Sequence, residues 1–167
     1  KLINEPIKEI VFIVGDPLIF GDKIIKELKD LAKKYNSKPL IYRQLTPLGT
    51  GHAIMCAKKS LRGKALVIYP DTLIRIKKRF NQKFDGVIWT KEVKNPESYG
   101  VVKLNSKNEI LDLVEKPLKF VSNQAVIGIY YFKEISKLKT QLERAITKNK
   151  TNSGEFQINH GILAMIK

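Results

Sequence analysis

Three short apolar runs alternate with segments of helical periodicity in the first 70 residues of the sequence. The runs cover residues 9–15, 39–43 and 64–69. One helical segment begins near Asp22, and the other covers residues 52–61. Such runs are typical of strands buried on both faces, and strands that alternate with helices form βαβ units around a parallel sheet. The alternation therefore predicts an α/β fold with a Rossmann-like, mainly parallel sheet flanked by helices.

The second half of the chain has a different pattern, in which strand signals follow one another closely. Residues 86–92, 99–104, 109–114 and 125–132 are predicted strands, and residues 135–146 form a predicted amphipathic helix. The sequence Asn-Ser-Lys-Asn between the second and third of these strands predicts a β-hairpin. No long linker, repeat or low-complexity tract interrupts the sequence, so we expect a single domain with a mixed sheet and a small β-rich part.

The chain is strongly basic, with 31 Lys and Arg residues against 16 Asp and Glu residues and a formal net charge of +15. Only five of the basic residues are Arg, whereas proteins that read DNA bases favour the bidentate Arg side chain. The dense basic cluster is Arg75, Lys77, Lys78 and Arg79. We therefore expect a solvated surface that attracts small anionic ligands such as nucleotides, with nucleic-acid binding as a less favoured alternative.

The sequence carries no signal for a membrane or for an oxidising compartment. No apolar run reaches the roughly 18 residues of a membrane helix, and the first ten residues lack the pattern of a signal peptide. The single cysteine, Cys56, cannot form an internal disulfide. We therefore expect a cytoplasmic protein without membrane association.

A glycine-rich stretch lies between the second predicted strand and the helix that follows it. It contains Gly49 and Gly51, and Gln44 precedes it at the end of the strand. Glycines permit a close approach of the backbone to a ligand, and the helix N-terminus behind them favours anions. The Gln44 side chain offers a donor and an acceptor, which suits the edge of a nucleotide base. The alternative interpretation is a tight turn that only begins a helix.

Asp71 directly follows the third predicted strand. Ligands of parallel α/β sheets bind beyond the carboxyl ends of the strands, so this carboxylate is well placed to hold Mg²⁺ beside phosphate groups. Taken by itself, an Asp at such a position is more often a turn former or a helix cap.

Five short motifs occur in a fixed order along the chain. They are Gln44 with Leu-Gly-Thr-Gly-His-Ala at 48–53, Asp-Thr-Leu at 71–73, Tyr-Gly-Val-Val at 99–102, Glu-Lys-Pro at 115–117, and the segment at 122–132. Together they resemble the sugar-1-phosphate nucleotidyltransferases, also called nucleoside-diphosphate-sugar pyrophosphorylases. The resemblance runs from about residue 9 to the end, and the order of the motifs carries it.

The resemblance implies a nucleotide-binding part at about residues 1–80. In this family the glycine-rich loop and its preceding Gln hold the base, which here would be Gln44, Gly49 and Thr50. The Asp after the central strand binds Mg²⁺ in the family, which makes Asp71 the expected metal ligand and a catalytic residue.

The resemblance also implies a sugar-binding part at about residues 85–167. The sugar phosphate is expected to contact Gly100, Glu115, Lys116 and Gly128. Lys116 is expected to be catalytic as well, because its charge can support an anionic oxygen during transfer.

Two departures from the family pattern affect these expectations. The family opens with a Gly-x-Gly-Thr-Arg-Leu loop around the triphosphate, and the sequence at hand has no counterpart. We therefore expect residues 1–167 to be an N-terminally incomplete domain with little or no activity by itself. His160 stands where the resemblance implies the second metal ligand, and Asn159 beside it offers an oxygen. We expect His52 to pack against the helix or cap it.

The resemblance implies transfer of a nucleotidyl group from a nucleoside triphosphate to a sugar 1-phosphate, with release of pyrophosphate and with Mg²⁺ as cofactor. The motif Leu-Gly-Thr-Gly-His-Ala is similar to that of uridylyltransferases that act on N-acetylglucosamine 1-phosphate. The resemblance therefore favours UTP or dTTP as the nucleotide, and a cytidine nucleotide is an open alternative. The alternative is a non-catalytic regulatory or scaffold subunit that keeps the fold. A homo-oligomer is compatible with the sequence.

Overall fold

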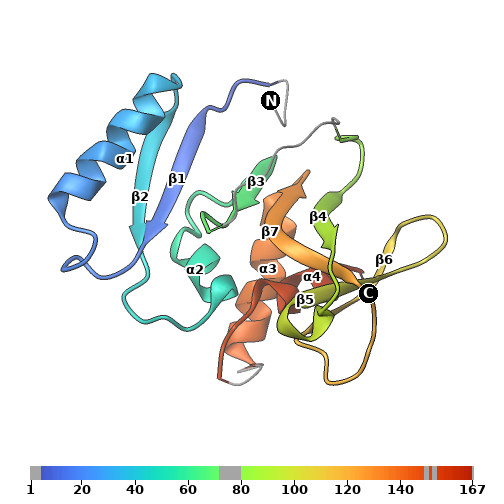
Figure 1. Cartoon of the computed structure of the whole chain (residues 1–167). Helices are drawn as coiled ribbons and strands as arrows, with labels where there is room; N and C mark the ends of the chain where they lie inside the picture. Colours follow the sequence, from blue (N-terminus) through green and yellow to red (C-terminus); the bar gives the residue numbers. More distant parts are fainter. Residues whose placement is uncertain (1–4, 72–79, 149–150, 152–153, 167) are drawn as a thin grey trace.

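The computed structural model describes residues 5–71, 80–148, 151 and 154–166, and within these ranges it contains two separate sheets and four α-helices (Figure 1). One sheet is a parallel pair of strands, and the other has five antiparallel strands. The basic cluster of residues 75–79 lies outside the described residues. No helix of the described part is long and apolar enough to cross a membrane.

The parallel pair is the βαβ unit that the first two apolar runs predict. Strand β1 (Glu9–Val14) pairs in parallel with β2 (Lys38–Arg43), and helix α1 (Asp22–Lys34) connects them. Helix α1 packs on this pair and buries Ala32 completely. Arg43 ties the end of β2 to the loop after β1, because its guanidinium donates to the carbonyl oxygen of Gly15 at 3.0 Å.

Strand β7 (Gln124–Phe132) organises the second sheet. Strand β4 (Gly86–Glu92) pairs with one edge of β7 at residues 86–88 and 90–92, with an irregularity in register between Ile88 and Thr90. The other edge is shared by β3 (Ala65–Ile68), which pairs with residues 129–132, and β5 (Gly100–Leu104), which pairs at Ala125. Strand β6 (Ile110–Glu115) extends the sheet beyond β5 as the predicted hairpin. Strand β7 therefore changes neighbours between residues 125 and 129.

The expectation of one mainly parallel sheet is wrong in this respect. The α/β class is confirmed, but the third apolar run, β3, pairs antiparallel with β7 instead of joining β1 and β2. A continuous apolar run reports that a strand is buried, and it carries no information about the direction of its partner. Strands β1 and β2 are also only half-buried except at Val14.

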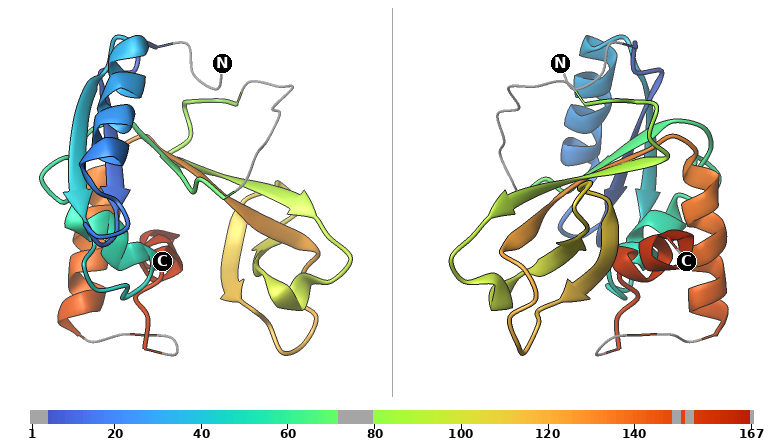
Figure 2. Two further views of the ribbon diagram at one scale, coloured as in Figure 1. Left: turned by 60° about the vertical axis from the view of Figure 1, so that its left-hand side comes forward. Right: turned by 90° about the vertical axis from the view of Figure 1, so that its right-hand side faces the viewer.

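Three helices form the core with one face of the second sheet. They are α2 (Thr50–Cys56), α3 (Ile135–Thr147) and α4 (Ile158–Ile166), and a 3₁₀ turn at Pro96–Ser98 precedes β5. Figure 2 shows α3 and α4 together on one side of β7. The core consists of apolar side chains from these helices and from strands β5, β6 and β7, namely Ile54, Met55, Val102, Leu113, Tyr130, Phe132, Leu138, Leu142, Ile158 and Ile162. Helix α2 is shorter than predicted, and α4 was not predicted.

A short backbone junction joins the start of α2 to the start of α4, and we call residues 48–52 and 156–158 the α2–α4 junction. The Phe156 N–H donates to the carbonyl oxygen of Leu48 at 2.8 Å. The Phe156 carbonyl oxygen accepts from the N–H groups of Gly51 at 2.7 Å and His52 at 3.3 Å. Two otherwise unsatisfied donors of the α2 N-terminus are therefore satisfied from within the chain.

The junction has no room for side chains at its two glycines. A Cβ on Gly51 would lie 2.8 Å from the Phe156 carbonyl oxygen, and one on Gly49 would lie 2.7 Å from the same atom. Gly49 also has φ +101°, which residues with a Cβ rarely adopt. The glycines thus permit close approach, but of the chain's own backbone.

We expect Gly51→Ala to lower the free energy of unfolding by about 1–3 kcal/mol, the usual cost of overpacking, although Ala is the better helix former. Urea unfolding measures the change. Gly15→Ala is the control, because a Cβ there would meet only the Phe20 ring at an ordinary 3.5 Å. Equal stability of Gly51→Ala and the wild-type chain would contradict this account of the junction.

Candidate functional site

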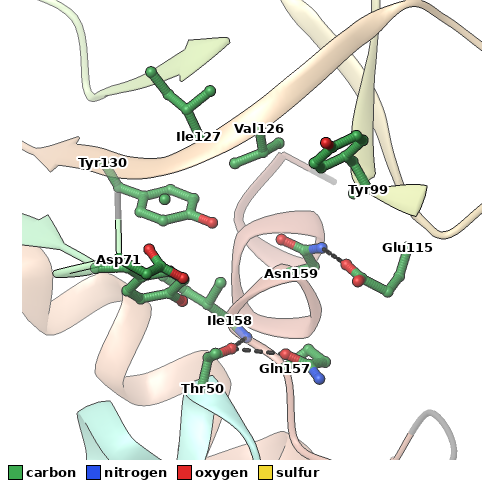
Figure 3. Close-up of a pocket in the computed structure, with 13 residues that line it drawn as sticks. Thr50, Asp71, Tyr99, Glu115, Val126, Ile127, Tyr130, Gln157, Ile158 and Asn159 are labelled. Atoms are coloured by element: carbon green, nitrogen blue, oxygen red, sulfur yellow. Dashed lines mark hydrogen bonds between the residues drawn. The ribbon is translucent and has the colours of Figure 1, made fainter. Parts of the chain in front are cut away.

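A cavity of about 280 Å³ opens where β7 changes its neighbour from β5 to β3 (Figure 3). Gly128 lies at this point with φ +72°, and its carbonyl oxygen accepts from the N–H of Tyr69 at 2.9 Å, just beyond the end of β3. The start of β5, at Gly100, lines the cavity as well. The cavity is thus built between two strand ends that diverge along one edge of β7.

The cavity wall combines rings, aliphatic side chains and oxygen-bearing polar groups. The rings are Tyr69, Tyr99 and Tyr130, and the aliphatic members are Val126, Ile127 and Ile158. The polar members are Thr50, Asp71, Glu115, Gln157 and Asn159. Burial raises the pKa of both Tyr69 and Tyr130, so these phenols remain protonated at neutral pH.

Two glycines keep the cavity open, each for a local steric reason. A Cβ on Gly128 would lie 2.8 Å from the Tyr69 ring, at a backbone conformation that already favours glycine. A Cβ on Gly100 would lie 2.8 Å from Oε2 of Glu115. Side chains at either position would therefore displace groups that form the wall.

Helix α4 contributes its first turn to the wall. The Thr50 hydroxyl donates to Oε1 of Gln157 at 2.8 Å and accepts from the N–H of Ile158 at 3.0 Å. One residue further on, Nδ2 of Asn159 donates to Oε2 of Glu115 at 3.2 Å. The α2–α4 junction therefore fixes where Asn159 and Glu115 meet.

The polar groups suit a hard cation. Asp71 is exposed at the cavity rim just beyond β3, and Glu115 and Asn159 add oxygen atoms to the same wall. Mg²⁺ prefers oxygen ligands, and it usually takes one or two carboxylates together with substrate phosphates and water. The Asp71 carboxylate at the rim, completed by phosphates and water, therefore fits the expected metal.

The structure brings six of the expected site residues to one cavity, namely Thr50, Asp71, Gly100, Glu115, Gly128 and Asn159. Gln44, Gly49, Lys116 and His160 do not line it. Sequence reasoning missed Tyr69, Tyr130 and Gln157, because nothing in an apolar strand or a helix start marks which side chain faces a cavity. Thr72 and Leu73 of the Asp-Thr-Leu motif lie outside the described residues.

Gln44 is half-buried at the end of β2, on the other side of the glycine-rich loop. Its Nε2 donates to the carbonyl oxygen of Gly49 at 3.0 Å and to Nδ1 of His52 at 2.9 Å. These two contacts use both amide hydrogens, so Gln44 offers only the acceptor Oε1 to a ligand. His52, expected only to pack or cap, orients this amide.

Lys116 follows Glu115 with φ +42°, a left-handed conformation that is uncommon for a residue with a Cβ. Its N–H donates to the carbonyl oxygen of Tyr99 at 3.0 Å, and its side chain is exposed. The backbone thus holds Lys116 beside the cavity, with the ammonium group on a flexible stem outside.

His160 has a structural contact that accounts for its position. Its Nδ1 accepts from the N–H of Gln157 at 3.2 Å, and its own N–H donates to the Gln157 carbonyl oxygen at 3.2 Å. The contact of the His160 side chain with the Gln157 N–H is one half of a capping box at the start of α4, and the second bond is a backbone turn. With Nδ1 engaged as an acceptor, the proton sits on Nε2, so neither ring nitrogen has a free lone pair. The assignment of His160 or Asn159 as second metal ligand stays a prediction.

Comparison with known proteins identifies the family. A family model described as Nucleotidyl transferase matches residues 1–160. The chain belongs to the nucleotidyl transferase family. It is 34% identical over 130 residues to "Bifunctional protein GlmU" of Methanococcus maripaludis, which covers 77% of this chain and 30% of that protein. It is 32% identical over 183 residues to the protein of the same name in Methanocaldococcus jannaschii, covering 98% of this chain and 42% of that protein.

The chain therefore spans less than half the length of these two relatives. Among solved structures, the nucleoside-diphosphate-sugar pyrophosphorylase of Vibrio cholerae RC9 matches with a TM-score of 0.69 over 93% of this chain and 67% of that chain. Its sequence is 18% identical, so this likeness concerns the fold. The resemblance inferred from the five motifs is confirmed.

The capping contact of His160 predicts a pH-dependent stability. Burial lowers the pKa of His160 below its ordinary value of 6.5. The unfolded chain takes up this proton near 6.5, while the folded chain keeps the imidazole neutral to lower pH, so the free energy of unfolding decreases as pH falls below about 6.5.

His160→Gln keeps an acceptor that can reach the Gln157 N–H but does not titrate, so its stability should depend less on pH between about pH 7 and pH 5. Urea unfolding at the two pH values measures this. The same pH dependence in variant and wild type would remove His160 from the capping role.

Proposed function

We propose that the full-length protein containing this chain transfers a nucleotidyl group from a nucleoside triphosphate to a sugar 1-phosphate and releases pyrophosphate. The observation that carries the proposal is the cavity itself. In a chain of the nucleotidyl transferase family, it combines three tyrosines with Glu115 and Asn159, and it has Asp71 at its rim. Aromatic and aliphatic walls with a few convergent polar groups are typical of sites for small ligands.

The sugar fits the enclosed part of the cavity. Tyr69, Tyr99 and Tyr130 offer ring surfaces to the apolar faces of a pyranose, and Glu115 offers carboxylate oxygens to its hydroxyl groups. The phosphate of the sugar would then lie toward the rim, within reach of the flexible Lys116 side chain. This orientation places the attacking phosphate oxygen where a nucleotide could approach from Asp71.

Asp71 is the residue that we expect to hold Mg²⁺, with the remaining ligands from phosphates and water. The ion would neutralise the charge that develops on the triphosphate during transfer. Positioning and charge neutralisation suffice for this in-line reaction, and no side-chain nucleophile is needed.

The contacts of Gln44 restrict how it can bind a base. Its amide hydrogens are bound to Gly49 and His52, so a base must donate to its free Oε1. Uracil and thymine present such a donor in their ring N–H. This is compatible with UTP or dTTP, which the glycine-rich motif favours, and the N–H donors of cytosine, adenine and guanine fit the same acceptor.

The test of the proposed reaction is pyrophosphate release by the full-length gene product with Mg²⁺, a panel of nucleoside triphosphates and a panel of sugar 1-phosphates. Asp71→Asn should lower kcat/KM on the order of 100-fold or more, because the neutral amide holds the metal poorly. Asp30→Asn is the matched control, since Asp30 is an exposed residue of α1 paired with Lys33. Intact turnover in Asp71→Asn would contradict the role of Asp71. Nucleotide binding without turnover under any condition would favour the non-catalytic alternative.

A second prediction concerns the orientation of Gln44. Gln44→Ala should weaken binding of the preferred nucleotide by about 1–2 kcal/mol and leave pyrophosphate binding unchanged. His52→Leu should also weaken nucleotide binding, because it removes the acceptor that fixes the amide.

His52→Asn is the matched variant, because its side-chain oxygen can take the place of Nδ1 and should restore most of the affinity. Titration calorimetry measures all three variants. An equal loss for the nucleotide and for pyrophosphate would rule out a base-binding role.

A further inference from the structure

The side-chain oxygen of Asn159 is a buried acceptor without a partner. Asn159 is only 8% exposed, and its Oδ1 has no hydrogen-bond partner among the described residues. A buried carbonyl oxygen that loses its hydrogen bond to water costs about 1–3 kcal/mol unless another donor replaces it. Buried polar groups of folded proteins are nearly always paired, so an unpaired one in a cavity wall indicates a missing donor.

The direction of this oxygen is fixed by its neighbour. Nδ2 of Asn159 donates to Oε2 of Glu115, so the reverse amide orientation would bring an amide oxygen against a carboxylate oxygen. Figure 3 shows Oδ1 turned away from Glu115, into the cavity. Asn159 thus presents an acceptor, and it cannot present a donor without losing its contact to Glu115.

The chemistry of the surrounding wall selects the ligand group that fills this place. The carboxylate of Glu115 and the amide oxygen of Asn159 both accept, and both repel an anionic phosphate. Mg²⁺ is usually held by one or two carboxylates together with phosphates and water, and Asp71 offers such a carboxylate at the rim. A neutral group with several O–H donors satisfies the wall, which is the chemistry of a sugar ring.

We propose that Oδ1 of Asn159 accepts a hydrogen bond from a hydroxyl group of the sugar substrate, and that Asn159 thereby acts with Glu115 as a determinant of sugar specificity. This inference rests on the proposed function, since it names how the sugar part of the substrate is recognised. It assigns Asn159 to the sugar rather than to the metal.

The experiment measures binding of sugar 1-phosphates to the full-length protein by titration calorimetry. The probes are the 1-phosphates of glucose, mannose and N-acetylglucosamine, and then the monodeoxy analogues of the one that binds best. Removing one particular hydroxyl should weaken binding to the wild-type protein roughly tenfold, the effect of one hydrogen bond. Asn159→Leu should weaken binding of the parent sugar phosphate by a similar factor. The affinity of this variant should be the same for the parent and for the analogue that lacks that hydroxyl.

The outcomes separate this inference from the function on which it rests. If none of the three sugar phosphates binds, both the proposed function and the role of Asn159 are wrong. If one of them binds, but removal of each hydroxyl weakens binding to Asn159→Leu as much as binding to the wild-type protein, only the role of Asn159 is wrong. The measurements on the wild-type protein need no variant. If removal of each hydroxyl in turn left its affinity unchanged, the inference would be overturned even if Asn159→Leu failed to fold.

A measurement of metal binding distinguishes whether Asn159 contacts the sugar or the cation. Mn²⁺ serves as the paramagnetic probe, and its binding is followed by electron paramagnetic resonance. Asn159→Leu should leave the Mn²⁺ affinity unchanged, whereas Asp71→Asn should reduce it. A loss of Mn²⁺ binding in Asn159→Leu would assign Oδ1 to the metal and would overturn the proposal.

Discussion

The carbonyl oxygen of Phe156 is the point at which the two ends of the site are held together. It accepts from the first free N–H groups of α2 and so fixes the start of that helix against the segment that begins α4. Thr50 then caps α4 from the opposite direction through its contact with Ile158. Because each helix start satisfies donors of the other, neither can move without exposing unpaired backbone groups. This contact also fixes the position of Asn159, which is the next residue.

The second constraint is the sharing of one edge of β7 by two strands. On the other edge, β4 pairs with residues 124–126 and 130–132 of β7 and has an irregularity between Ile88 and Thr90. The space between β3 and β5 lies on the opposite edge. Gly128 turns the backbone at this place, and the missing Cβ leaves room for the ring of Tyr69. A sheet of continuous ladders would have filled this space with paired backbone. The change of neighbour along this edge of β7 is therefore what creates the binding cavity.

The part of the site that sequence could predict is the part that lies at strand ends. Asp71, Gly100 and Glu115 each stand where a strand ends or begins, and all three line the same cavity. The direction of β3 could not be predicted, because an apolar run fits either orientation. The glycines of the 48–52 loop were interpreted as ligand contacts, yet they face the backbone of Phe156, a neighbour more than a hundred positions away in the sequence. A contact of such long range leaves no local signal.

Asn159 and His160 show why neighbouring positions can have unrelated functions. Successive residues of an α-helix point about 100° apart, and here Asn159 lines the cavity whereas His160 does not. His160 turns back to cap the helix start, and Asn159 turns inward to Glu115. A Leu or Val at position 159 would bury as well and would need no partner, whereas the amide keeps Glu115 in place and leaves an acceptor exposed only to the cavity. Since that acceptor has no donor within the described chain, its hydrogen bond must come from outside the chain, either from a water in the cavity or from a ligand hydroxyl that replaces the water.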